Sequence, residues 1–263
     1  MPLVVQYPIL SLVGIPIGLF LGMLLMLEVG RRVGLKRLAR DPEGAKEGFG
    51  ALEGSVFGLL GLLIAFTFAG AAERYDGRRE LVVQEANAIG DVWARLDTLP
   101  PETQPALRDG MRRYLESRLE TYRRMPDVAA VMAELKNSTR IQDEIWKQAV
   151  AACATPEGQR VTMLVLPALD AAFDMTLVRT AAGFHHPPIA IFAMLFLLAL
   201  AGALIAGLGM AKGKARNWTI MLGFALTTAV AVYTILDIEF PRIGLIRVDA
   251  SDQMLEDVLE TMR

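Results

Sequence analysis

Residues 54–79 read GSVFGLLGLLIAFTFAGAAERYDGRR, and this stretch decides the fold. Its first nineteen residues carry no charge, which is enough for a helix to cross the hydrocarbon core of a membrane. Charges of both signs follow at once. The next segment, 80–96, contains no Pro and spaces its apolar residues as one helical face. We therefore predict one long helix that spans a membrane and continues into a water-exposed domain.

Two neighbouring faces of this predicted span differ in the size of their side chains. Small residues recur every three or four positions at Gly54, Gly58, Gly61 and Ala65, which lets another helix approach closely. We expect these small residues to serve helix packing. The adjacent face is bulkier and contains Ser55, Leu59, Leu62, Phe66 and Gly70. Its spacing suits either ordinary packing against other helices or a ring around a pore.

Two segments carry a family resemblance. Phe66 stands eight residues before Arg74, as a neck Phe stands before an Arg in the second transmembrane helix of bestrophins. After the last apolar run, LDIEFPRIGLIRVDASDQML resembles the acidic-Pro-Gly-Asp segment of bestrophins, with Glu239, Pro241, Gly244 and Asp249 in comparable order. Over nearly the whole chain, RYDGRR, EANAIG and FPRIGLIRVDASDQ resemble a bacterial bestrophin-like family of unknown function.

The resemblance implies a symmetric pentamer that conducts small ions, with chloride or bicarbonate expected. It places the pore neck on the second span at Gly58, Leu59, Leu62 and Phe66. It places the pore mouth beyond that span at Arg74, Asp76, Arg78 and Arg79. Apolar rings can gate a channel by dewetting, and the partly positive edges of Phe66 rings would favour a dehydrated anion. Gly58 has no side chain, so we expect a short neck.

Composition limits the classes of protein that fit. A hydrophobic fraction of 53% is high for a soluble domain, and 21% charged residues are too many for a chain wholly in lipid. The net charge of −2 gives no basic field, so we expect no nucleic-acid partner. The chain lacks a phosphate-binding loop, a GxSxG nucleophile elbow, an HExxH motif and a CxxC pair. We therefore expect no catalytic residues, no metal site and no cofactor.

Four apolar runs predict an all-α protein that crosses the bacterial inner (plasma) membrane four times. They cover residues 8–27, 54–72, 187–211 and 217–236. The predicted domains are spans 1 and 2 in residues 1–72, a helical water-exposed domain inserted at 73–183, spans 3 and 4 in 184–236, and a tail at 237–263 with a short amphipathic helix.

The inserted domain reads as helix throughout, because no segment alternates apolar and polar residues for long. One helix buries a stripe of Leu107, Met111, Leu115, Leu119 and Tyr122 and ends at Pro126. Ser138 offers a cap for the following helix. In the last helix of the domain, Asp170 and Asp174 lie four residues apart, where they either bind a cation or face solvent.

Charge does not settle the orientation in the membrane. The loops after the first and third spans hold nine cations, which by the positive-inside rule places both loops in the cytoplasm and the inserted domain outside. They are Arg31, Arg32, Lys36, Arg37, Arg40, Lys46, Lys212, Lys214 and Arg216. Bestrophins have the opposite arrangement, and both orientations stay open.

Two functions fit these patterns. One is an oligomeric channel with the second span of each subunit around the axis, as the resemblance implies. The other is a non-conducting membrane sensor or scaffold that acts through its helical domain. Passage of ions would distinguish them.

Overall fold

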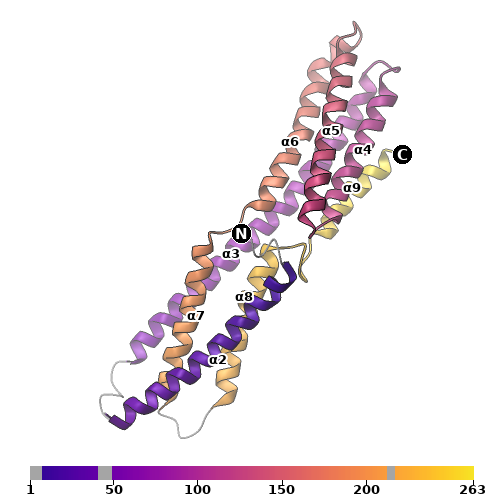
Figure 1. The fold of residues 1–263 in the computed structure, drawn as a ribbon. Helices are drawn as coiled ribbons and strands as arrows, with labels where there is room; N and C mark the ends of the chain where they lie inside the picture. Colours follow the sequence, from indigo (N-terminus) through magenta and orange to yellow (C-terminus); the bar gives the residue numbers. More distant parts are fainter. Residues whose placement is uncertain (1–7, 41–48, 212–216) are drawn as a thin grey trace. The chain divides into compact units, whose positions relative to one another are not determined.

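The computed structural model describes residues 8–40, 49–211 and 217–263, and within them the chain is helical with no strand. The all-α prediction is confirmed. Figure 1 shows the helices in chain order. They are α2 (Pro8–Arg40), α3 (Phe49–Arg95), α4 (Gln104–Arg123), α5 (Val128–Cys153), α6 (Thr162–Phe184), α7 (Ile189–Met210), α8 (Trp218–Glu239) and α9 (Asp249–Thr261), with 3₁₀ turns η2 (Leu96–Thr98) and η3 (Gly158–Val161).

The chain packs as two units. The first, which we call the membrane unit, contains the described residues up to Glu73 together with His186–Leu245. The second, the bundle unit, contains Arg74–His185 and Ile246–Arg263. Four helical stretches are long and apolar enough to cross a membrane, within Ser11–Arg40, Gly50–Thr98, Gly158–Met210 and Trp218–Glu239. Helix α3 contributes residues to both units.

The first described helix extends further than the sequence predicted. The segment after residue 27 was predicted to be a loop from Arg31 onward, but α2 continues as helix to Arg40. No Pro lies between Pro16 and Pro42, and Glu28 accepts a hydrogen bond from Arg32 at 2.7 Å, one turn away. Such i,i+4 pairs support a helix outside lipid. Of the nine cations counted for the orientation, Lys46, Lys212, Lys214 and Arg216 lie outside the described residues.

Glycines set the packing of α2 on α7 in the membrane unit. A Cβ added to Gly30 would lie 2.1 Å from the carbonyl oxygen of Leu204, and one added to Gly207 would lie 2.2 Å from that of Leu27. Because no real Cβ can come so close to a backbone oxygen, only glycine allows these two backbones to meet. This is the small-residue packing of membrane helices. Gly30 and Gly207 were not among the glycines predicted to serve helix packing.

We predict that Gly30→Ala lowers the stability of the protein in detergent, whereas Gly58→Ala does not change packing within a subunit. The first change forces α2 and α7 apart, and overpacking of this kind costs about 1 to 3 kcal/mol. A Cβ at Gly58 meets nothing within 4 Å. Thermal unfolding of the two purified variants would check this, and equal midpoints would contradict the packing described above.

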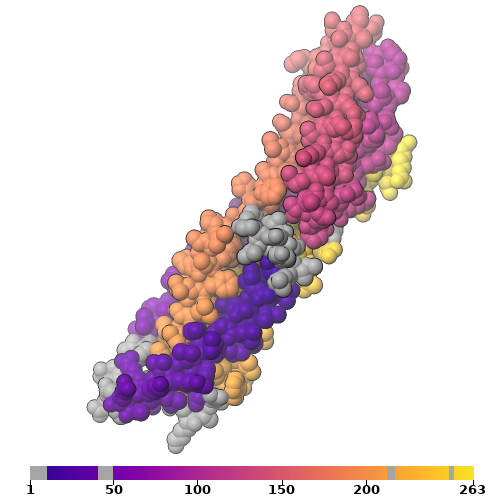
Figure 2. All heavy atoms as spheres, viewed as in Figure 1, coloured from indigo at the N-terminus to yellow at the C-terminus, as the bar shows by residue number. Residues whose placement is uncertain are grey.

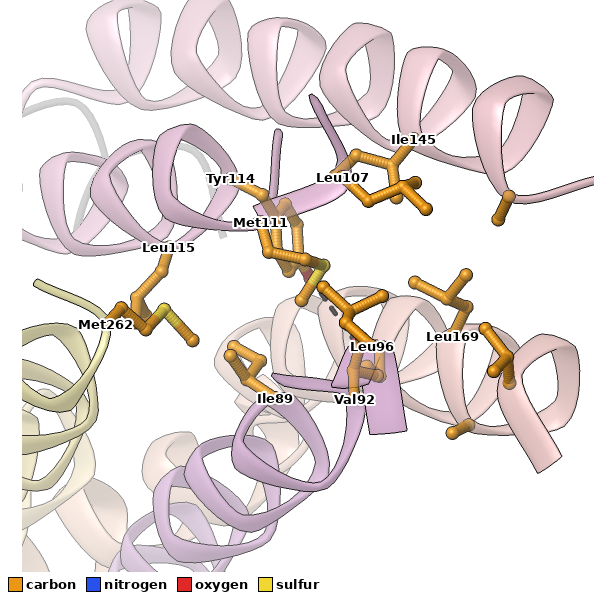
Figure 3. Close-up of a cluster of buried hydrophobic side chains, with 14 of the residues drawn as sticks. Ile89, Val92, Leu96, Leu107, Met111, Tyr114, Leu115, Ile145, Leu169 and Met262 are labelled. Carbon is orange, nitrogen blue, oxygen red and sulfur yellow. Dashed lines mark hydrogen bonds between the residues drawn. The ribbon is translucent and has the colours of Figure 1, made fainter. Parts of the chain in front are cut away.

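The bundle unit has its own hydrophobic core, built by α4, α5, α6, α9 and the later part of α3. Figure 3 shows side chains of these helices pointing toward one another. The apolar stripe predicted on α4 is buried at Leu107, Met111, Leu115 and Leu119. The amphipathic helix α9 adds Leu255 to the same core, and Met262 directly after the helix adds a second side chain. Apolar burial therefore holds this unit together independently of the membrane unit.

The start of α5 differs from the prediction. Ser138 was expected to cap this helix, but α5 begins ten residues earlier, after Asp127, whose carboxylate accepts a hydrogen bond from the backbone N–H of Ala130 at 3.0 Å. Asp127 directly follows Pro126 and is the stronger cap. Ser138 is buried in mid-helix, where its hydroxyl lies 2.8 Å from that of Ser117 on α4.

Candidate pore-lining face and its flanking charges

The span of α3 has an inward and an outward face within one subunit. Inward-facing Leu60 is 3% exposed and Phe57 makes an edge-to-face contact with Phe224 of α8, with ring centroids 5.3 Å apart. Outward, Leu62 is 51% and Phe66 68% exposed. Both faces are apolar, so the sequence could not tell which of them packs inside the subunit. The structure places Leu62 and Phe66 on the face that the rest of the described chain leaves uncovered.

The small residues lie on this same uncovered side. Gly54, Gly58 and Gly61 are exposed, and a Cβ added to any of them would meet nothing within 4 Å. Ala65 and Leu59 are exposed as well. The small face and the bulky face of the sequence are thus two adjoining strips of one surface, which we call the outward face of α3. Within the described residues of a subunit, these glycines have no helix to pack against.

The four charged residues predicted at the pore mouth, 74, 76, 78 and 79, have different surroundings in the structure. Asp76 and Arg79 are exposed and form an ion pair of 3.6 Å. Arg78 instead donates hydrogen bonds to the backbone carbonyls of Ala182, at 3.2 Å, and His185, at 3.0 Å, at the end of α6. These carbonyls have no partner within α6, so a guanidinium there serves as a C-terminal cap. Arg74 is partly buried.

Beyond the span, the exposed side of α3 is acidic and polar. Within the bundle unit Asp76, Glu80, Gln84, Asn87 and Asp91 are exposed at intervals of three or four residues, as one face of a helix. Arg79 is the exposed cation nearest to them on this helix. The net charge of this strip is therefore negative, which the sequence reading had not separated from the buried charges of α3.

Glu85, from the EANAIG stretch, is fully buried between two arginines. Its carboxylate accepts a hydrogen bond from Arg118 of α4 at 2.7 Å and a second from Arg179 of α6. Arg179 also lies 3.7 Å from Asp252 of α9. Its guanidinium stacks 3.9 Å from the ring centroid of Tyr122. This cluster, which we call the Glu85 network, ties α3, α4, α6 and α9 together.

The network shifts the pKa of its members. Burial alone would raise the pKa of Glu85, but the charges and hydrogen bonds of Arg118 and Arg179 lower it below its ordinary value. Burial alone would lower the pKa of Arg118, whereas Tyr122 and Glu85 raise it. Glu85 and Arg118 thus both stay charged near neutral pH. Arg118 was missed from the sequence, although it lies on the same face of α4 as the apolar stripe, three residues after Leu115.

The segment after α8 folds back on that helix. The carboxylate of Asp237 accepts a hydrogen bond from the backbone N–H of Leu245 at 2.9 Å, and a Cβ added to Gly244 would overlap this carboxylate. Glu239 lies 2.8 Å from Nδ1 of His186, whose ring stacks on Phe240 with centroids 4.5 Å apart. The acidic-Pro-Gly pattern thus builds a tight local fold. In the described part of the chain, no three His, Cys, Asp or Glu residues come together to hold a metal.

Comparisons with known proteins give two matches. A family model described as the bestrophin-like domain matches residues 17–253. A crystal structure of a mutated bacterial bestrophin homolog from Klebsiella pneumoniae superposes with a TM-score of 0.63 at 13% sequence identity. The alignment covers 91% of this chain and 97% of that one. A comparison with curated proteins finds no match.

Proposed function

Because the chain belongs to the bestrophin-like family, we propose that it is a homo-oligomeric ion channel of the bacterial inner membrane, with the outward face of α3 toward the pore. The observation that carries this proposal is that two large apolar side chains, Leu62 and Phe66, are left exposed on the span of α3. Beside them, Gly54, Gly58 and Gly61 leave room for a neighbouring helix. One strip would contact the next subunit, and the other would line the axis.

In this arrangement Leu62 and Phe66 form the neck, with Leu59 and Gly58 one turn before Leu62 in α3. Rings of apolar side chains in a narrow pore exclude water and thereby hold back ions. A pore lined by one helix from each subunit requires a cyclic oligomer. We take the number of subunits, five, from the family resemblance. The bundle unit is then the water-exposed domain inserted between the second and third spans. We assign no catalytic activity and no cofactor.

Two features of α3 act on the choice of ion in opposite directions. The edges of the Phe66 rings favour anions such as chloride or bicarbonate at the neck. The acidic strip of Asp76, Glu80 and Asp91 repels anions and collects cations near the same helix. Because the barrier lies at the constriction, we propose that anions pass preferentially. The acidic strip should make that preference weak.

Recording from planar bilayers with unequal potassium chloride solutions would test the channel and its selectivity together. We expect a reversal potential displaced toward that of chloride, and a larger displacement after Glu80→Gln with Asp91→Asn, because the strip then repels anions less. A reversal potential toward that of potassium would overturn the anion assignment and leave the channel intact. Glu116→Gln, an exposed carboxylate on α4, provides the matched control.

A non-conducting sensor or scaffold is the alternative. The hydrophobic core of the bundle unit and the Glu85 network would serve a binding role as readily as a gate. Absence of current from intact oligomers, over a range of voltage and pH, would favour this second function.

A further inference from the structure

Helix α6 presents an apolar strip outward from the bundle unit. Met163 is 84% and Leu177 71% exposed, and Phe184 is exposed at the end of the helix. The strip continues through further exposed positions at alternating spacings of four and three residues, which are Pro167, Asp170, Asp174 and Ala181. Such a spacing marks a seam between two helices. An apolar strip of this kind outside a membrane usually marks a binding surface.

Every charge that α6 exposes is negative. Its charged residues are Asp170, Asp174 and Arg179, and Arg179 is buried in the Glu85 network. Neither aspartate makes an ion pair with any residue that the structure describes. A partner for this strip should therefore bring apolar side chains and positive charge.

Helix α5 presents a strip with these properties. Met132, Trp146 and Val150 are exposed apolar residues on its outer side. The same side exposes Lys136, Thr139, Arg140, Asp143 and Lys147, so that its net charge is positive. The exposed positions 132, 136, 139, 143, 146 and 150 repeat the spacing of four and three found on α6. In Figure 2 the atoms of α5 and α6 lie at the surface.

We propose that the outward strip of α6 binds the outward strip of α5 from a second copy of this chain. This inference rests on the proposed homo-oligomer and names the surfaces that join its subunits in the bundle unit. Two different strips that match each other make a head-to-tail contact, which closes into a ring when repeated by rotation. An α6–α6 contact would instead bring four aspartates together.

Other exposed surfaces of the bundle unit fit α6 less well. The outer side of α3 is acidic, and α9 exposes Asp257 and Glu260. Like charges placed opposite each other reduce affinity and exclude such pairings. Among α3, α5 and α9, the strip of α5 is therefore the complementary one.

Cyclic symmetry also sets the level at which the two strips meet. Within one subunit, Gln142 of α5 donates a hydrogen bond to Thr176 of α6 at 3.0 Å, and the two helices run in opposite directions along the chain. Asp170 therefore lies about level with Lys147. A rotation about an axis roughly parallel to the helices does not change the height of a residue along that axis, so the same residues stay at equal height in neighbouring subunits. Asp170 of one copy would thus face Lys147 of its neighbour.

Charge reversal tests the contact. We expect Asp170→Lys to reduce the oligomer mass in mild detergent, and Lys147→Glu to do the same. Combining the two changes should restore the wild-type mass, because the facing charges are complementary again. Glu102→Lys with Glu116→Lys reverses two exposed carboxylates away from both strips and should have no effect. Unchanged mass in both reversed variants would overturn the proposal.

A disulfide identifies the two surfaces directly. One tagged copy carries Asp170→Cys and a second, differently tagged copy carries Lys147→Cys. Oxidation of membranes that contain both should join the two kinds of copy, while the native Cys153 stays buried. Crosslinks only between copies of the same kind would show that another surface covers α6. A wild-type protein that is monomeric would sink this inference and the proposed channel together, whereas a stable oligomer without current would sink the channel alone.

Discussion

Replacement of Glu85 by Ala is expected to cost about 3 to 5 kcal/mol of stability in the bundle unit, because it leaves two buried guanidinium groups without their carboxylate. Glu85 and Arg118 are fully buried, and Arg179 is nearly so. One nitrogen of Arg118, Nη1, already has no hydrogen-bond partner among the described residues. Losing the carboxylate would add further unpaired donors to a site that water does not reach.

The measurement is the midpoint of thermal unfolding, followed by the helical signal of purified protein in detergent. For a chain of this length, that loss corresponds to a fall of about 6 to 20 °C. Glu116→Ala removes an exposed carboxylate from α4 and should leave the midpoint nearly unchanged. A similar small effect for Glu85→Ala would show that the Glu85 network contributes little.

The same network predicts a dependence on pH. Because the folded protein holds the pKa of Glu85 below its ordinary value of 4.5, the carboxylate contributes stability above that pH. This contribution is lost as the pH falls through the lowered pKa. Glu85→Gln keeps the shape of the side chain but cannot titrate. The stability of this variant should therefore change less than that of the wild type on acidification below 4.5.

The sequence was sufficient to predict the elements that depend on local pattern. Apolar runs located the spans, and the stripe of Leu107, Met111 and Leu115 located the buried face of α4. These features depend on periodicity, which neighbours along the chain reveal. The continuation of α2 to Arg40 was missed because its basic side chains resemble those of a loop. Cations next to a span are compatible with a helix that has left the lipid.

What the sequence could not provide was contact between distant residues. Gly30 and Gly58 look alike in the sequence, yet one meets a backbone carbonyl and the other meets nothing. Arg78 and Arg79 are adjacent, but one caps α6 and the other is exposed beside Asp76. The difference comes from the angle at which each side chain leaves its helix relative to a partner far away in the chain. Helical spacing defines faces, and only packing decides which face is covered.

The outward face of α3 leads to the prediction with the largest functional effect. Replacing both Leu62 and Phe66 with Ala should make liposomes that carry the protein pass small ions much faster than wild type does. In the proposed neck, these side chains supply the apolar bulk that excludes water. Alanine at both positions widens the constriction and lets it hydrate. The stability of an isolated subunit should change little, because both side chains are already half exposed or more.

Leu60→Ala supplies the matched control on the same helix. Leu60 is buried against the other helices of the membrane unit, so its truncation leaves a cavity and costs about 2 to 5 kcal/mol. It lies on the inward face, away from the proposed axis, and should not raise the flux. If the double variant loses stability as the control does and gains no conductance, Leu62 and Phe66 pack between subunits instead of lining a pore. Intact oligomers of both proteins that pass no ions would then favour the sensor or scaffold, because an apolar face buried between subunits needs no channel to explain it.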